Sequence, residues 1–297
     1  MTDPSPIARF DPARPVGIVG AGVMGAKVAW ASARAGLETR LYDVEPGKAK
    51  RAAASAAEWG TVEERKRVWD RLIVADTLED AMAGAQLGFE NVPERLELKR
   101  EVHAAMSAEL PADACLGTNA SSLTCTPMAE TSGRPDRFFN LNWSDPRSMR
   151  LVELMTSPVT APATREFARA WARHVGMVVV ETRKEQLGYS FNRLWRVIKK
   201  EALRQVAGGY ATPEDLDKAW MLAFGTPFGP CGLMDEVGLG SVLAIEKVYF
   251  ADSGDESDRP PALLEGMVAR GELGAQSGRG FYEHPDPPYR RPGFLDA

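Results

Sequence analysis

The stretch VGIVGAGVMG, residues 16–25, decides the fold. It begins with Val16–Val19, an apolar run short enough for one buried strand. Residues 23–35 then show a helical pattern, and Gly36 is a typical residue for ending a helix. A strand, a glycine-rich turn and a helix in this order begin a βαβ unit, and such units build parallel sheets.

The turn has the pattern G-x-G-x-x-G, which in this setting predicts a dinucleotide site. Gly20 permits the tight turn, Gly22 lets the backbone approach a pyrophosphate, and Gly25 allows the helix to pack closely on the strand. Val23 and Met24 open the helix, whose N-terminus offers N–H donors to phosphate. We therefore predict that these residues bind a cofactor; the alternative is a glycine turn without a ligand.

Asp43 indicates which dinucleotide is bound. It ends a predicted strand, residues 38–43, and lies 23 positions after Gly20. A carboxylate at this place binds both ribose hydroxyls and repels a 2′-phosphate. Arg40 lies before it on the same strand. We therefore predict NAD rather than NADP.

Composition excludes several other classes of protein. The 297 residues are 44% hydrophobic and 26% charged, which is typical of a globular protein with a sizeable core. A net charge of −5 without a basic block argues against a nucleic-acid partner, and no apolar run is long enough for a membrane span. The odd set of cysteines, Cys115, Cys125 and Cys231, has no metal-ligand spacing, so we predict no metal site and a reduced, cytoplasmic setting.

Strand and helix patterns alternate up to about residue 182, and helical patterns follow. This predicts an α/β chain, with a Rossmann-type doubly wound parallel sheet followed by an all-α C-terminal domain. We expect an N-terminal extension over residues 1–14, an NAD-binding domain over 15–184 and a helical domain over 185–297, whose proline-rich tail loops over the surface. Expected strands lie at residues 16–19, 38–43, 87–91, 114–119, 137–142, 151–155 and 177–182. Expected helices lie at residues 23–35, 47–59, 62–72, 94–110, 164–176, 191–209, 212–225, 238–251 and 260–272.

Further motifs appear in an order that resembles the L-3-hydroxyacyl-CoA dehydrogenase family. They are VPERLELK, TNASSL, LVEL, LGYSFNRLW, GTPFGPCGLMDEVGL and SGRGFYEH, and the resemblance runs from about residue 15 to residue 284. It implies NAD, interconversion of a hydroxyl and an oxo group on a small-molecule substrate, and a homodimer formed through the helical domain.

The resemblance also implies roles for individual residues. Glu94 and Lys99 would lie near the nicotinamide ribose, and Asn119 and Ser121 beside nicotinamide and substrate. Glu153 matches the glutamate that orients the family's catalytic histidine. Asn192, at the start of the helical domain, would lie at the substrate.

The segment RFFNLNWSDP, residues 137–146, departs from the family pattern R-F-x-G-L-H-F-F-N-P. When the two patterns are aligned, Asn142 occupies the position of the family's histidine. An imidazole with a pKa near the operating pH can take the hydroxyl proton that hydride transfer leaves behind. An amide cannot accept that proton, but it can donate a hydrogen bond to a carbonyl.

Three interpretations of this departure remain open. The proton could pass through Glu153 and a water held by Asn142, or Asp145 could place a second carboxylate at the site, the alternative being a loop-capping role. The protein could also bind NAD and a ligand with little or no turnover, as a binding or structural protein. The chain's histidines are expected to be surface or packing residues; they are His103, His174 and His284.

The substrate is less defined than the cofactor. The family includes enzymes of acyl thioesters and of small hydroxyacids, and the altered segment favours a non-standard substrate. Arg147 and Arg150 could hold a carboxylate or could simply lie at the surface. A dehydrogenase of the 6-phosphogluconate or 3-hydroxyisobutyrate type would need a catalytic lysine, and Lys199 and Lys200 lie too far beyond Asn192 for that role.

Overall fold

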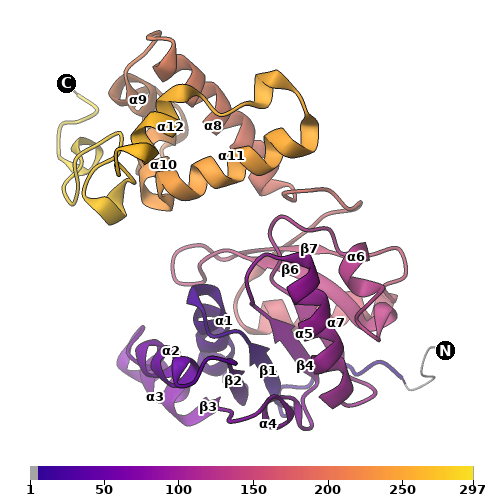
Figure 1. Ribbon diagram of the computed structural model, residues 1–297. Helices are drawn as coiled ribbons and strands as arrows, with labels where there is room; N and C mark the ends of the chain where they lie inside the picture. Colours follow the sequence, from indigo (N-terminus) through magenta and orange to yellow (C-terminus); the bar gives the residue numbers. More distant parts are fainter. Residues whose placement is uncertain (1–5, 297) are drawn as a thin grey trace. The chain divides into compact units, whose positions relative to one another are not determined.

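The computed structural model describes residues 6–296, which form two compact units (Figure 1). The first unit ends at Ser190 and the second begins at Phe191. Residues 1–5 of the expected N-terminal extension lie outside the described residues. The rest of that extension packs on the first unit, where the Ala8 N–H donates to the Asp113 carbonyl at 2.9 Å and Arg14 pairs with the Asp113 carboxylate at 2.7 Å.

An eight-stranded sheet with the order β3-β2-β1-β4-β5-β6-β7-β8 forms the centre of the first unit. The strands are β1 (Val16–Val19), β2 (Thr39–Tyr42), β3 (Leu72–Val74), β4 (Leu87–Glu90), β5 (Cys115–Thr118), β6 (Phe138–Trp143), β7 (Leu151–Met155) and β8 (Val178–Glu181). The predicted Rossmann-type sheet is confirmed with one difference, because β7 pairs with β6 antiparallel while all other neighbours are parallel. Only residues 144–150 connect β6 to β7, too few for the crossover that a parallel pair requires.

Helices cover both faces of this sheet. They are α1 (Val23–Arg34), α2 (Lys48–Ala57), α3 (Val62–Arg71), α4 (Leu78–Met82), α5 (Leu96–Glu109), α6 (Thr126–Ala129) and α7 (Pro162–His174). The sequence pattern did not predict β3, α4 or α6, each of which has five residues or fewer. The predicted helix over residues 62–72 begins at a capping box formed by Thr61 and Glu64, but it ends one residue early because Leu72 is already extended.

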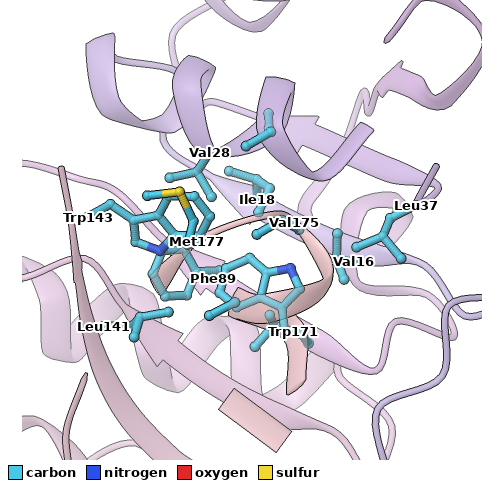
Figure 2. Packing of buried hydrophobic residues seen from close by; sticks show 14 of the residues in the cluster. Val16, Ile18, Val28, Leu37, Phe89, Leu141, Trp143, Trp171, Val175 and Met177 are labelled. Atoms are coloured by element: carbon cyan, nitrogen blue, oxygen red, sulfur yellow. The ribbon is translucent and has the colours of Figure 1, made fainter. Parts of the chain in front are cut away.

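Successive side chains of a strand point to opposite faces of the sheet, so alternate residues pack into two separate cores. Ile18 and Phe89 belong to the core under α1 and α7, whereas Val19 belongs to the core under α4 and α5. Side chains of strands and helices meet in the first core, where the Trp171 ring lies 4.9 Å from Phe89 and 5.3 Å from Trp143 between centroids (Figure 2). This packing fixes the ends of β1, β4 and β6, from which the site is built.

The second unit is all-α, as predicted, apart from isolated bridges at Arg279 among its described residues. Its helices are α8 (Phe191–Ala207), α9 (Pro213–Phe224), α10 (Pro230–Val237), α11 (Leu239–Ser253) and α12 (Ala262–Ala269), with one 3-10 turn, Glu256–Asp258, between α11 and α12. The sequence pattern did not predict α10, which has eight residues. The tail differs from the prediction of a surface loop, because Tyr289 and Phe294 are buried in the core of this unit. Across residues 6–296, the helices are all too short or too polar to cross a membrane.

Candidate active site

The glycine turn has the backbone geometry that a phosphate cradle needs. Gly20 has a φ of +91°, a conformation that L side chains rarely adopt. A Cβ on Gly25 would lie 1.7 Å from the Gly20 carbonyl oxygen, so only glycine lets α1 approach the turn. A Cβ on Gly22 would meet open space. The backbone of Gly22, the N-cap of α1, is therefore accessible to a pyrophosphate.

Asp43 is held against the glycine turn. Its Oδ2 accepts a hydrogen bond from the Ala21 N–H at 2.7 Å and lies 3.2 Å from Lys48 Nζ, and its Oδ1 accepts from the Glu45 N–H at 2.9 Å. Burial raises the pKa of Asp43, but these hydrogen bonds outweigh burial and lower it overall. Arg40 donates to Glu38 and to carbonyls of the α4 region, so its guanidinium is already bound elsewhere.

A cavity of about 750 Å³ opens beside the turn and Asp43. Most of the predicted cofactor residues line it: Gly20, Gly22, Val23, Met24, Asp43, Glu94 and Asn119. Lys48, which the sequence analysis missed, lies at the same wall. Gly25 and Lys99 do not line the cavity. Gly25 lets α1 pack against the turn, and Lys99 contacts Glu94, which lines the cavity. The open Gly22 backbone, the ionised Asp43 and the size of this cavity fit a bound dinucleotide.

Lys99 is buried and joins two carboxylates. Its Nζ lies 2.9 Å from Glu90 Oε1 and 3.4 Å from Glu94 Oε2. The Glu90 carboxylate, at the end of β4, also accepts hydrogen bonds from Thr118 Oγ1 at 2.7 Å and the Val92 N–H, and lies 2.9 Å from His103 Nε2. Lys99 therefore acts from within the protein, by holding Glu94 in place.

Glu90 is a central group that the sequence analysis missed. Burial raises the pKa of Glu90, but the hydrogen bond to His103 and the charge of Lys99 outweigh burial and lower it. His103, expected at the surface or in packing, is fully buried beside this carboxylate. The sequence contained one signal that could have identified Glu90: it is a single acid at the end of an otherwise apolar strand pattern.

The loop after β5 is fastened to its neighbours on both sides. Glu94 Oε1 accepts hydrogen bonds from the backbone N–H groups of Ser121 at 2.8 Å and Ser122 at 2.6 Å. Asn119 donates to Asn91 Oδ1 at 2.9 Å and accepts from the Trp143 N–H at 2.8 Å. These bonds bring the carboxyl ends of β4, β5 and β6 together, which is where open α/β sheets bind ligands.

Asn142 and Glu153 are partners across the antiparallel pair of β6 and β7. Directly opposed residues on such strands project from the same face, with Cβ atoms about 4.5–5.5 Å apart. Glu153 is 2% exposed, and its Oε1 accepts a hydrogen bond from the Ser190 N–H at 3.0 Å. Asn192 lies on α8 and belongs to the second unit.

Asp145 is already engaged by two cations. Its Oδ2 lies 2.9 Å from Lys27 Nζ and 2.9 Å from Arg147 Nη2, and its Oδ1 accepts from the Arg147 backbone at 3.0 Å. Burial raises the pKa of Asp145, but the hydrogen bonds from Arg147 and Lys27 lower it strongly overall. Arg147 also stacks on Trp59 at 4.4 Å, and Arg150 donates to the Gly176 carbonyl at 2.7 Å. These contacts suit the loop-capping interpretation.

The other candidate groups also have structural partners. Lys199 forms a buried ion pair with Glu246 at 2.8 Å, and Lys200 pairs with Asp258 at 2.6 Å. Of the remaining histidines, His284 lies 3.1 Å from the buried Asp235 carboxylate. The cysteines are buried and unpaired, and residues 6–296 contain no group of three or more His, Cys, Asp or Glu side chains placed to hold a metal.

Comparison with known proteins agrees with this geometry. Residues 15–186 match the family described as 3-hydroxyacyl-CoA dehydrogenase, NAD binding domain, and residues 188–284 match its C-terminal domain. The chain belongs to the 3-hydroxyacyl-CoA dehydrogenase family. This confirms the predicted family and the predicted NAD cofactor. It also confirms the prediction that the protein is an NAD-dependent dehydrogenase acting on CH–OH groups.

Individual known proteins are similar to the chain over most of its length. A probable 3-hydroxybutyryl-CoA dehydrogenase of Bacillus subtilis is 34% identical over 277 residues, 90% of this chain and 96% of that protein. A 5-formyl-3-hydroxy-2-methylpyridine 4-carboxylate 5-dehydrogenase of Mesorhizobium japonicum is 29% identical over 91% of this chain and 90% of its own length. The crystal structure of (S)-3-hydroxybutyryl-CoA dehydrogenase from Ralstonia eutropha has a TM-score of 0.83 at 28% identity, covering 92% of this chain and 100% of that one.

Replacing Asp43 by Asn should weaken NAD binding about tenfold and narrow the preference for NAD over NADP. The amide can still accept from the Ala21 N–H, but it loses the charge that strengthens hydrogen bonds from ribose hydroxyls and repels a 2′-phosphate. Isothermal titration with both dinucleotides measures the change. Asp70→Asn, in an exposed pair with Lys66, serves as the control. An unchanged ratio of the two affinities would contradict this role of Asp43.

Proposed function

We propose that this family member interconverts a hydroxyl and an oxo group on a hydroxyacid or hydroxyacyl substrate, with Glu153 rather than a histidine handling the proton. The observation that carries the proposal is the cross-strand pair of Asn142 and Glu153, in which a buried carboxylate lies beside an amide. Bound NAD would supply the hydride acceptor for oxidation, and NADH the donor for reduction.

Different residues of the first unit would bind different parts of the cofactor. The backbone at Gly22 and the carboxylate of Asp43 would bind the pyrophosphate and the adenosine ribose. Glu94, fixed by Lys99, orders the loop that contains Asn119 and Ser121, which we place beside nicotinamide and substrate. We assign cofactor binding to residues 15–184, and substrate contacts, including Asn192, to residues 185–297.

The proton step uses groups of the β6–β7 pair. The Asn142 amide donates a hydrogen bond that orients and polarises the substrate oxygen. An ordered water between this oxygen and Glu153 passes the proton to the carboxylate, because an amide cannot hold it. Asp145 is the weaker candidate for a base, since Lys27 and Arg147 stabilise its charged form and so reduce its tendency to take a proton.

The substrate class is proposed from the relatives and from the site together. Two of the named relatives act on 3-hydroxybutyryl-CoA, and a third has a pyridine carboxylate in its name. Residues 142–145 of this chain replace the His-Phe-Phe-Asn run of the family pattern. This altered segment favours a small acid over an acyl thioester.

We further propose a homodimer formed through the second unit, in a reducing, cytoplasmic setting. Helices of this unit expose large apolar side chains: Leu194, Val197, Leu222, Phe224, Ile245 and Val248. Leu194 and Val197 are 68% and 66% exposed and lie three positions apart on α8, so they share one face. Exposed apolar residues that share a helix face are typical of an interface between subunits.

Glu153→Gln should lower kcat about 100-fold or more while leaving NAD affinity within about twofold, because it removes the proton acceptor and not the cofactor contacts. NADH formation on a panel of hydroxyacids and 3-hydroxyacyl thioesters, with titration of NAD, measures both. Asp145→Asn is the matched control and should keep most of the activity. Loss of activity in the control alone would assign the proton to Asp145. Tight NAD binding by the unaltered protein without turnover of any substrate would favour the binding-protein alternative.

Asn142→His should create or raise activity on 3-hydroxybutyryl-CoA by about tenfold or more if the pocket accepts CoA esters, because an imidazole can take the proton directly. Asn142→Gln keeps an amide and should show no gain. The same absorbance measurement of NADH compares the variants. A histidine variant that gains activity only on small hydroxyacids would confirm the preference for a small acid, and a variant without any gain would contradict a role of residue 142 at the reacting oxygen.

The double change Leu194→Glu and Val197→Glu should convert a dimer to a monomer, because each carboxylate would have to leave water at the interface. Light scattering coupled to size-exclusion chromatography gives the mass, and circular dichroism checks that α8 is retained. Val159→Glu, at an exposed apolar residue of the first unit, should leave the mass unchanged. An unaltered protein that elutes with a monomer mass would contradict the dimer.

A further inference from the structure

Tyr189 has a backbone conformation that a tyrosine rarely adopts. Its φ is +52°, and among the described residues it is the one non-glycine residue with a positive φ. A bulky side chain in this region is strained unless its surroundings hold it there. The ring is fully buried in the core under α5 and α6, together with Ala120 and Phe138.

The hydroxyl of Tyr189 reaches the loop after β5. It donates a hydrogen bond to the Ala120 carbonyl oxygen at 3.1 Å. Ala120 lies between Asn119 and Ser121, the two loop residues assigned to the nicotinamide side of the site. Burial, followed by nearby acidic groups, raises the pKa of Tyr189 well above its ordinary value, so the hydroxyl keeps its proton and remains a donor.

The backbone at Tyr189 also fixes the other half of the site. The turn directs the next amide, the Ser190 N–H, to Glu153 Oε1 at 3.0 Å. Gln186 Nε2 closes the turn by donating to the Tyr189 carbonyl at 3.2 Å. The same segment is anchored at its start, where Glu185 accepts from the Thr126 N–H at 2.6 Å.

We propose that Tyr189 is a positioning residue that couples the loop beside nicotinamide to the carboxylate of Glu153. Its side chain holds the loop at Ala120, and its left-handed backbone presents the Ser190 N–H to Glu153, so one residue sets the geometry of both groups. The inference rests on the proposed function for the role of Glu153. The contact with the loop holds independently of turnover, which allows the two to be tested apart.

Tyr189→Phe tests the side-chain part of the coupling, because it removes only the hydroxyl and keeps both the buried ring and the backbone turn. Tyr289→Phe is the matched control, since Tyr289 is a buried tyrosine of the second unit whose hydroxyl lies 3.0 Å from Glu236 Oε1. Both variants retain an aromatic ring in its core, so both are expected to fold, and denaturant unfolding checks this. Hydrogen–deuterium exchange of the Ser121 and Ser122 amides is measured with NADH bound, alongside kcat and the KM for NAD.

In Tyr189→Phe the two amides should exchange about tenfold faster and kcat should fall about tenfold, while the KM for NAD stays within about twofold because Gly22 and Asp43 are untouched. The control should change none of these values. Exchange rates equal to those of the unaltered protein would overturn the proposal, as would faster exchange with an unchanged kcat. Faster exchange in a protein that turns over no substrate would support the positioning contact and overturn the proposed function instead.

Discussion

The negative charge of Glu90, kept out of water at the end of β4, organises the edge of the sheet where ligands bind. A carboxylate is costly to bury unless donors surround it, and Lys99, His103 and Thr118 meet that requirement. Lys99 then extends the arrangement to Glu94, which holds the N–H groups of the next loop. Removing Glu90 would leave the buried Lys99 with only the more distant Glu94 carboxylate, and removing Lys99 would take a cation away from the buried Glu90, so the site depends on both.

The two halves of the site, the cofactor side and the side of the β6–β7 pair, are therefore held by different kinds of contact. The cofactor side is shaped by backbone, with glycines at the turn and one carboxylate held by amides. The side to which we assign the proton step is shaped by strand pairing, because Asn142 and Glu153 face each other through the register of β6 and β7. Different physical constraints act on each half, so a substitution in the β6–β7 pair leaves the glycine turn and Asp43 unchanged.

Local sequence signals predicted much of the fold. The glycine turn, Asp43 and the long helices were found because each depends on residues close together in the chain. Short elements such as β3 and α4 were missed, since three to five residues give too little periodicity. The antiparallel direction of β7 was missed as well, because alternation alone does not show which way a strand runs; the short connection between the two expected strands was the signal that could have shown it. Glu90 was overlooked because its meaning depends on Lys99 and His103, which fold back onto it from α5.

The hairpin of β6 and β7 has a consequence for how this family can vary. Strand pairing has a period of two, so inserting or deleting one residue within either strand would turn Asn142 or Glu153 to the opposite face of the sheet. The connecting residues 144–150 carry no such restriction, because loop length has a small effect on pairing. Length variation among relatives should therefore concentrate in that connection, which can change in length while Asn142 and Glu153 stay in register.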